Sequence, residues 1–260
     1  MADYKIITVN SDNVDEFGFF CVKNKKHPGY IAKRSWLHKR FEEGLRIKLI
    51  LTHDGKQAGF LEYIPGEFTW RVVEAPNYFV IHCIWVASAK FPYEGMAAAL
   101  FRECLDDAAS SGQSGVAVVT SDGSFMARKD VFLKHGFEQV DEAEPHFQLL
   151  KKSVKPAPMP AFPTNWQDRS DRFQGLQLIY TDQCPYIGKA VDEMPPVAVK
   201  YGIELKLHEL NDSAQARETL LSPYGMINLV YNGRLLADHP ISATRFGNIL
   251  RKDLKLEAQE

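Results

Sequence analysis

Apolar positions in the first 150 residues follow two periods, which together predict a mixed α/β structure. Short runs rich in β-branched and aromatic residues predict half-buried or buried strands. Longer stretches with apolar residues spaced by three and four predict helices that cover those strands. The predicted strands lie at 47–52, 58–64, 70–74, 79–86, 116–120 and 147–151, and the predicted helices at 15–25, 32–43, 95–109 and 125–134.

A compositional break follows this first half. Residues 153–174 contain prolines at 156, 158, 160 and 163 and then a polar, charged stretch. Alternating prolines remove the backbone donors that helices and sheets require, so we expect an extended linker, held to a surface through Phe162 and Trp166. The sequence therefore predicts two domains, 1–152 and 175–260.

After the linker the alternation of strand and helix begins again. The predicted order is β-α-β-α-β-β-α, which in about 85 residues indicates a compact three-layer α/β arrangement. Asn232-Gly233 predicts a tight hairpin turn, and Pro195-Pro196 predicts a kink or break in the first helix. The elements lie at 176–180, up to 200, 203–207, 213–220, 227–231, 234–237 and from 243 onward.

Composition narrows the function classes. The chain is 45% hydrophobic and 25% charged with a net charge of −2, which gives no indication of a nucleic-acid or membrane partner. No apolar run approaches the roughly 20 residues of a membrane helix, and the N-terminus lacks signal-peptide architecture. The four cysteines have neither paired nor metal-ligand spacing, so we expect a reducing, cytoplasmic location and no metal site. The oligomeric state stays open.

Residues 77–100 contain the most informative local pattern. A hydrophobic strand, 78–86, leads through a short loop into a helix of small residues that begins at Gly95. The first backbone N–H groups of such a helix, together with its dipole, favour an anionic ligand. Gly95, Ala97 and Ala98 would let a ligand approach the main chain. The alternative is an ordinary buried strand followed by a helix packed on the core.

Three segments in order resemble the GNAT superfamily of acyl-CoA-dependent N-acyltransferases, over about residues 5–152. KQAGFLEYIPGE at 56–67 resembles the central antiparallel strands, PYEGMA at 92–97 the pyrophosphate loop, and FLKHGF at 132–137 a C-terminal signature. More narrowly, the chain resembles bacterial acetyltransferases with a C-terminal YoaP-type domain. The resemblance implies a mixed, mostly antiparallel sheet with flanking helices, opened into a V-shaped cleft, and acetyl-CoA as co-substrate.

The resemblance also implies positions for the coenzyme. Pantetheine would contact main chain at Ile84, Trp85 and Val86, and the adenine end would lie near 125–134. The pyrophosphate would sit on the helix start formed by Tyr93, Glu94, Gly95, Met96, Ala97 and Ala98. Three residues depart from the family pattern. Pro92 and Glu94 remove a cation and add an anion in the loop, and Phe132 stands where many members have the tyrosine that protonates the leaving thiolate.

Acyl transfer to an amine needs a group that removes a proton, because an amine with a lysine-like pKa of about 10.4 is charged at neutral pH. His82 and Glu74 are the predicted bases, with Glu62 as a further candidate. For His82 the alternative is a core histidine with satisfied hydrogen bonds. Main-chain N–H groups of 84–86 would stabilise the oxyanion. The acceptor is a small-molecule or peptide amine that the sequence does not identify.

Residues 175–250 resemble a thioredoxin-like fold of the YoaP type. Cys184-Pro185-Tyr186-Ile187 stands where glutaredoxins place Cys-Pro-Tyr-Cys, so Cys184 is a possible reactive thiol at a helix start. Ile187 excludes an internal disulfide cycle. The alternatives to an N-acetyltransferase are therefore a non-catalytic acyl-CoA or protein-binding module, and a monothiol redox protein that uses Cys184.

Overall fold

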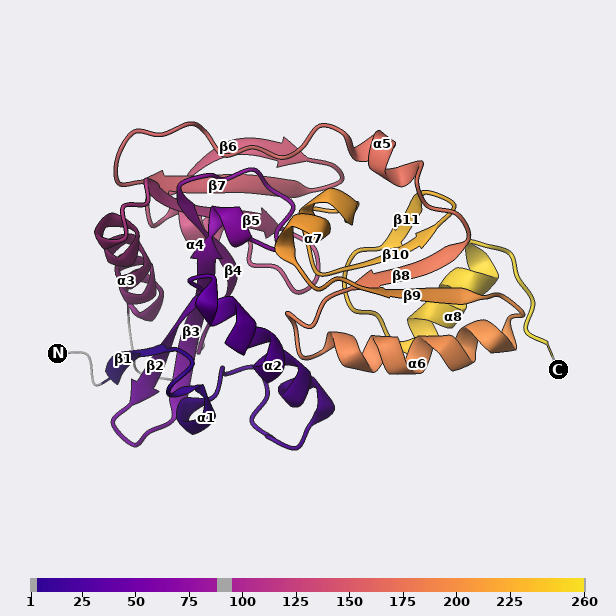
Figure 1. Ribbon diagram of the computed structural model, residues 1–260, viewed down its shortest axis with the longest axis horizontal. Coiled ribbons are helices and arrows are strands. Elements are labelled where there is room, and N and C mark those ends of the chain that lie inside the picture. Colours follow the sequence, from indigo (N-terminus) through magenta and orange to yellow (C-terminus); the bar gives the residue numbers. More distant parts are fainter. Residues whose placement is uncertain (1–3, 88–94, 260) are drawn as a thin grey trace.

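A computed structural model describes residues 4–87 and 95–259, which form a seven-stranded and a four-stranded sheet lying side by side (Figure 1). Long-range strand pairing builds the first sheet from β1(Tyr4–Val9), β2(Arg46–Thr52), β3(Gln57–Pro65), β4(Tyr78–Val86), β5(Gly115–Ser121), β6(Glu138–Ala143) and β7(Phe147–Ser153).

The strand order of this sheet is β1-β2-β3-β4-β5-β7-β6. Every neighbouring pair is antiparallel except β4 and β5, which run parallel from Tyr78↔Gly115 to Ile81↔Val118. A single parallel pair needs a crossover connection, and α3(Met96–Ser110) supplies it. This arrangement fits the acyltransferase fold that the sequence predicts for the first half.

Helices cover both faces of the first sheet. The apolar face of α3 packs on β2 to β5, while α2(Pro28–Glu42) packs on the opposite face of β2 and β3. His27 caps α2 by accepting from the N–H of Gly29, with Pro28 at the first helical position. The remaining short elements are α1(Val14–Phe17), the 3₁₀ turn η1(Gly66–Phe68) and α4(Asp130–Leu133).

The second sheet has the order β11-β10-β8-β9, in which only β8 and β9 are parallel. The β-α-β-α-β-β-α order predicted from the sequence is present. Its elements are β8(Leu176–Tyr180), α6(Ile187–Lys200), β9(Leu205–Glu209), α7(Ser213–Thr219), β10(Ile227–Tyr231), β11(Arg234–Ala237) and α8(Ala243–Lys252), preceded by α5(Trp166–Ser170).

The two sheets share their hydrophobic cores. One cluster joins Val80, Val119 and Leu149 of the first sheet to Leu178 and Leu229 of the second. A second cluster joins α2 and β2 to residues of β8, β10 and α7 in the same way. The segment between the sheets is extended, and it pairs with Glu74 through Ala161 while burying Phe162. Removing either half would therefore expose apolar surface on the other.

Several predicted elements differ from the observed ones. Residues 70–74 are not a strand, since only Glu74 forms a bridge, yet the segment is buried because it lies between the sheets. The predicted helix at 15–25 shortens to α1, which positive φ angles at Gly18 and Phe20 end. The helix at 125–134 shortens to α4, β9 begins two residues late, and α6 continues through Pro195-Pro196. The predictions omitted β1 and β6.

Among the residues that the structure describes, no helix combines the length and apolar character needed to cross a membrane.

Gly225 tests the contact between the halves. It has φ +74°, and a Cβ added there would overlap the carbonyl oxygen of Trp70. Gly112 has the same φ with nothing nearby, so it is a matched control. We expect Gly225→Ala to lower the free energy of unfolding by about 1–3 kcal/mol more than Gly112→Ala, measured by urea denaturation. Equal losses would show that the overlap is relieved without cost.

Candidate active site

The sheet opens at the midpoint of β4. Pairing between β4 and β5 stops after Ile81↔Val118, although β4 continues to pair with β3 as far as Val86↔Gly59. Residues 82–86 therefore keep one hydrogen-bonded neighbour and present their other backbone edge to the gap. This is the V-shaped opening between adjacent parallel strands that the sequence predicts.

A β-bulge lies at the same point. Tyr63 pairs with Ile81 and Glu62 pairs with Cys83, so His82 is the extra residue. Opposite partners in a ladder project to the same face, and a bulge turns two successive side chains to one side. His82 and Cys83 consequently both face away from α3, whereas Ile81 and Ile84 pack on the α3 side.

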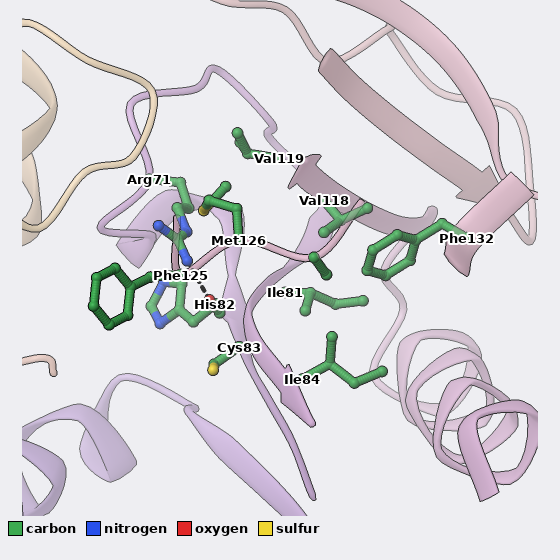
Figure 2. Close-up of a pocket in the computed structure, with 11 residues that line it drawn as sticks. Arg71, Ile81, His82, Cys83, Ile84, Val118, Val119, Phe125, Met126 and Phe132 are labelled. Atoms are coloured by element: carbon green, nitrogen blue, oxygen red, sulfur yellow. Dashed lines mark hydrogen bonds between the residues drawn. The ribbon is translucent and has the colours of Figure 1, made fainter. Parts of the chain in front are cut away.

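A pocket runs through this opening (Figure 2). Ile81, Ile84 and Phe132 line it on the α3 side, and Arg71 and Cys83 line it on the other. The remaining lining comes from His82 of β4, from β5 and from the segment after β5. The pocket is small, about 30 Å³ in volume, and the buried guanidinium of Arg71 lies among its largely apolar lining residues. These additional lining residues are His82, Val118, Val119, Phe125, Met126 and Ala127.

The helix start predicted to bind an anion is partly described. Gly95 is the N-cap of α3, with φ +77° and nothing within 4 Å of an added Cβ. The first intrahelical bond is from Ala99 N–H to Gly95 C=O, so the N–H groups of Met96, Ala97 and Ala98 have no partner within the helix. Met96 is buried and Ala98 exposed. Pro92, Tyr93 and Glu94 lie outside the described residues.

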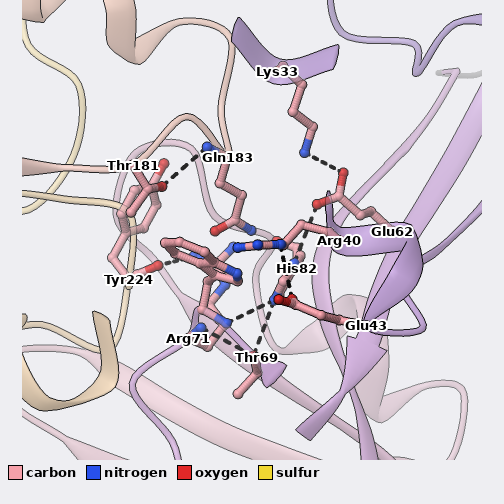
Figure 3. Close-up of polar contacts among 11 residues, drawn as sticks. Lys33, Arg40, Glu43, Glu62, Thr69, Arg71, His82, Thr181, Gln183 and Tyr224 are labelled. Atoms are coloured by element: carbon pink, nitrogen blue, oxygen red, sulfur yellow. Dashed lines mark hydrogen bonds and ion pairs between the residues drawn. The ribbon is translucent and has the colours of Figure 1, made fainter. Parts of the chain in front are cut away.

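A buried polar network occupies the face opposite α3 (Figure 3). Lys33 of α2 donates to Glu62 of β3 at 2.7 Å, with side chains only 3% and 4% exposed. The other Glu62 oxygen lies 3.4 Å from His82 Nδ1. His82 Nε2 accepts from the backbone N–H of Trp70 at 3.2 Å and lies 3.2 Å from Thr69 Oγ1. The imidazole thus links β3, β4 and the segment between them.

These contacts assign the charges of the network. Lys33 and His82 hold the pKa of the Glu62 carboxyl at about 2 despite its burial, so it is ionised. Burial lowers the pKa of His82 to about 4, so the imidazole is neutral at neutral pH. Because Nε2 accepts from Trp70, the proton lies on Nδ1, facing Glu62. His82 presents no free basic lone pair to the pocket.

Arg71 connects the two halves of the molecule. One terminal nitrogen donates to the carbonyl of Tyr224, which belongs to the loop before β10, and the other donates to the carbonyl of His82 on the opened strand. The guanidinium also lies 5.2 Å from the centre of the Tyr224 ring. Arg71 is buried, and burial lowers its pKa below the ordinary arginine value, yet an arginine stays protonated at neutral pH.

The predicted site residues separate into two groups. Ile84, Phe132 and His82 line the pocket, and Trp85 and Val86 follow on the same strand. Phe132 is fully buried and packs on Phe101 and Phe137, with no hydroxyl to offer a leaving group.

Glu74 lies elsewhere. It is exposed, takes part in the isolated bridge with Ala161, and lines a different hollow beside Arg169 and Arg217. This placement gives the expected catalytic role of Glu74 no geometric support.

Cys184 lies at the contact between the halves. Its neighbour Pro185 packs against Gly29 at the start of α2, and the Tyr186 hydroxyl donates to the carbonyl of Cys21 at 2.8 Å. Burial raises the pKa of the Cys184 thiol, although a backbone hydrogen bond from Tyr186 partly opposes this. The helix start therefore does not produce the lowered pKa of a reactive thiolate.

Cys83 is the thiol that faces the pocket. It is exposed, but surrounding protein raises its pKa to about 12, so it is a neutral thiol at neutral pH. No group of three or more His, Cys, Asp or Glu side chains that could hold a metal occurs within the described ranges.

Sequence reasoning missed three features of this site. Arg71 lies inside 70–74, which the sequence predicts as a strand. Cys83 lies in an apolar segment, which is typical of a core residue, and Lys33 lies on an early helix, where a residue can either shape a pocket or pack at the surface. The one available signal was the charge of Lys33 and Arg71 within apolar surroundings. A buried charge needs a partner, and sequence alone does not show which one.

The Lys33–Glu62 pair gives a prediction about stability. Glu62→Gln leaves the buried Lys33 ammonium without its carboxylate, so we expect the free energy of unfolding to fall by about 3–5 kcal/mol. Adding Lys33→Met should restore much of this loss. Glu193→Gln, in the exposed pair with Lys189, should cost less than about 1 kcal/mol. Urea denaturation of the four proteins is the measurement. A similar small cost for both single variants would contradict burial of the pair.

His82 gives a prediction about pH. Its folded pKa of about 4 lies below the ordinary 6.5, so between these values the unfolded chain binds a proton that the folded chain does not. The contribution of His82 to the free energy of unfolding is therefore fully present above pH 6.5. It is lost as the pH falls towards 4, which lowers the free energy of unfolding by about 1–3 kcal/mol. In His82→Gln this part of the pH dependence should disappear, whereas in exposed His208→Gln it should persist. Identical pH slopes in all three proteins would refute the assignment.

Comparison with known proteins gives one informative relative. No family model matches the chain. A Bacillus subtilis protein named uncharacterized N-acetyltransferase YoaP is 27% identical over 251 residues, which cover 94% of this chain and 97% of the relative. Since nearly the whole of both chains is matched, the similarity includes both sheets.

Solved structures match part of the chain. They include ribosomal-protein-S5-alanine acetyltransferase from Vibrio fischeri (TM-score 0.44, 12% identity, 59% of this chain and 94% of that one). Another is the GNAT-family N-acetyltransferase YhbS from Escherichia coli in complex with CoA (TM-score 0.40, 13% identity, 63% and 91%). These scores are too low to carry an argument about activity. The chain is similar, over nearly its whole length, to a protein named as an N-acetyltransferase.

Proposed function

We propose that this protein is an acetyl-CoA-dependent N-acetyltransferase that transfers the acetyl group directly to an amine. The observation that carries the proposal is the separation of β4 from β5 after Ile81, with a pocket through the opening and the start of α3 beyond it. Similarity to a protein named N-acetyltransferase YoaP agrees with acetyl transfer.

The coenzyme and the acceptor would bind on opposite faces of the opening. The pantetheine arm would pass along the free edge of 84–86, and the phosphates would meet the N–H groups at the start of α3. Tyr93 and Glu94 remain proposed parts of that phosphate site. The acceptor would enter from the opposite face, where Arg71 and Cys83 line the pocket.

We also propose the two-domain organisation predicted from the sequence. Residues 1–152 would form the acyltransferase domain, 153–174 the linker, and 175–260 a thioredoxin-like domain. The order β11-β10-β8-β9 with β8 and β9 parallel supports this second assignment. The turn that carries Cys184 packs on α2, and the carbonyl of Tyr224 accepts a hydrogen bond from Arg71. The second domain would therefore form one wall of the acceptor site.

In the reaction the amine nitrogen attacks the thioester carbonyl, a C–N bond forms and the C–S bond breaks. Free N–H groups of the opened strand would stabilise the oxyanion. The nitrogen loses one proton to solvent, and the coenzyme thiolate takes up one. With Phe132 in place of a tyrosine, water would supply that proton, which a thiol with a pKa of about 8.5 permits.

For the amine proton, we propose that the acceptor reacts in its neutral form. His82 is a weak base, and its Nε2 lone pair already accepts from the backbone N–H of Trp70. Glu62 is ion-paired with Lys33, and Glu74 lies outside the pocket. His82 then acts as a positioning residue that fixes the bulge. The double variant His82→Gln with Glu74→Gln should retain turnover, with a kcat/KM that rises with pH according to the pKa of the amine.

The test uses the full chain with acetyl-CoA and an amine panel. We expect saturable binding in calorimetry and thiol release that depends on an amine. Met126→Trp should narrow the pocket and lower turnover at least about tenfold, because a small displacement of the reacting atoms is costly. Met159→Trp is the matched control, since Met159 is exposed and outside the pocket. Binding without turnover would leave a non-catalytic acyl-CoA module, and absence of binding would refute both.

A further inference from the structure

Arg71 carries a positive charge that the protein does not neutralise. Its two terminal nitrogens donate to main-chain carbonyls, which are neutral. No carboxylate in the described part of the chain lies within ion-pair distance of it, and Glu62 already pairs with Lys33 at 2.7 Å. Buried charges are normally paired, because removing an ion from water costs several kcal/mol.

The guanidinium also has unused hydrogen-bonding capacity. Its Nε–H is buried and has no acceptor among residues 4–87 and 95–259. Arg71 is 4% exposed, and it lines the pocket beside His82 and Cys83 (Figure 2). The carbonyls of His82 and Tyr224 hold the guanidinium in position from two sides, so its remaining donors have a fixed direction. A fixed, partly unsatisfied guanidinium is suited to a carboxylate.

A second buried polar atom without a partner among the described residues belongs to Gln183, next to this network. The side-chain oxygen of Gln183 is buried without a hydrogen-bond donor, although the residue is only 4% exposed. Figure 3 shows this side chain extending from its turn toward the network around Arg71 and His82. Gln183 does not line the pocket, so the ligand's charge is inferred from Arg71 alone.

The charges around the pocket determine the sign of that ligand. Lys33 and Glu62 cancel, His82 is neutral, and Cys83 is a neutral thiol, so Arg71 leaves one net positive charge. The acetyl thioester is uncharged, and the coenzyme phosphates would bind beyond the opening at α3. The positive charge of Arg71 is therefore available to bind an anionic group of the acceptor.

We propose that the acceptor is an amine that also bears a carboxylate, an amino acid or related amino-carboxylic acid, and that Arg71 binds the carboxylate. This inference rests on the proposed function. Arg71 would hold the acceptor on the face opposite α3, with its amine directed to the thioester at Cys83 and Ile84. It is a specificity-determining residue that takes no part in proton transfer.

The test compares the α-amino acids with their α-amides as acceptors of acetyl-CoA in the full-length protein. Amidation removes the anion, and it lowers the amine pKa, which would by itself favour the amide. We expect kcat/KM to be about 10–100-fold higher for the acid of the preferred side chain. Arg71→Lys should reduce this acid-to-amide ratio at least about tenfold, because lysine lacks the planar fork.

Arg40→Lys is the matched control. Arg40 is equally buried, but it pairs with Glu43 at 3.0 Å and does not line the pocket. In Arg40→Lys the ratio of kcat/KM for the amino acid to kcat/KM for its amide should stay at the wild-type value. If Arg71→Lys does not fold, the ratio in the wild-type protein alone decides. Turnover with equal rates for acids and amides would overturn this inference while keeping the proposed function, whereas absence of acetyl-CoA binding would overturn the proposed function itself. If the enzyme preferred succinyl-CoA to acetyl-CoA and used amines that lack a carboxylate, Arg71 would bind the carboxylate of the acyl donor, and the inference would be overturned.

Discussion

The loss of pairing between β4 and β5 after Ile81 is the constraint on which the site depends. While the strands are paired, their backbone groups satisfy each other and nothing can pass between them. Beyond that point the β4 edge needs other partners, and the pocket forms in the gap. The bulge at His82 coincides with the separation and turns two successive side chains toward the acceptor face.

The buried polar network maintains this opening. His82 is held by Trp70 and by Glu62, and Glu62 is held by Lys33. Arg71 donates one hydrogen bond to the carbonyl of His82 on the opened edge and another to the carbonyl of Tyr224 in the other half. The position of the second sheet and the shape of the bulge are thus coupled through a few charged groups. Stability and function overlap here, because the residues that organise the pocket also hold the halves together.

The same network limits the chemistry available. The groups nearest the opening are a neutral imidazole, a neutral thiol and an ionised but paired carboxylate. This combination would suit the proposed transfer to an amine that arrives uncharged, and within the described residues of this network Arg71 has no carboxylate partner. The cysteine that resembles a redox nucleophile in sequence instead has a raised pKa and lies in a packed contact. A similar motif in a different environment has different reactivity.

The sequence by itself determined most strands, the crossover helix, the hairpin at Asn232-Gly233 and the order of both halves, because local apolar period and turn chemistry specify these elements. Resemblance added the opening beside Ile84 to Val86. Tertiary structure decided the rest. The directions of His82 and Cys83 depend on the register with β3, and the partner of Arg71 lies 153 residues away. Residues 70–74 have the alternation of a strand but lack neighbouring strands. Long-range pairing and burial, which local pattern does not contain, set the chemistry of this site.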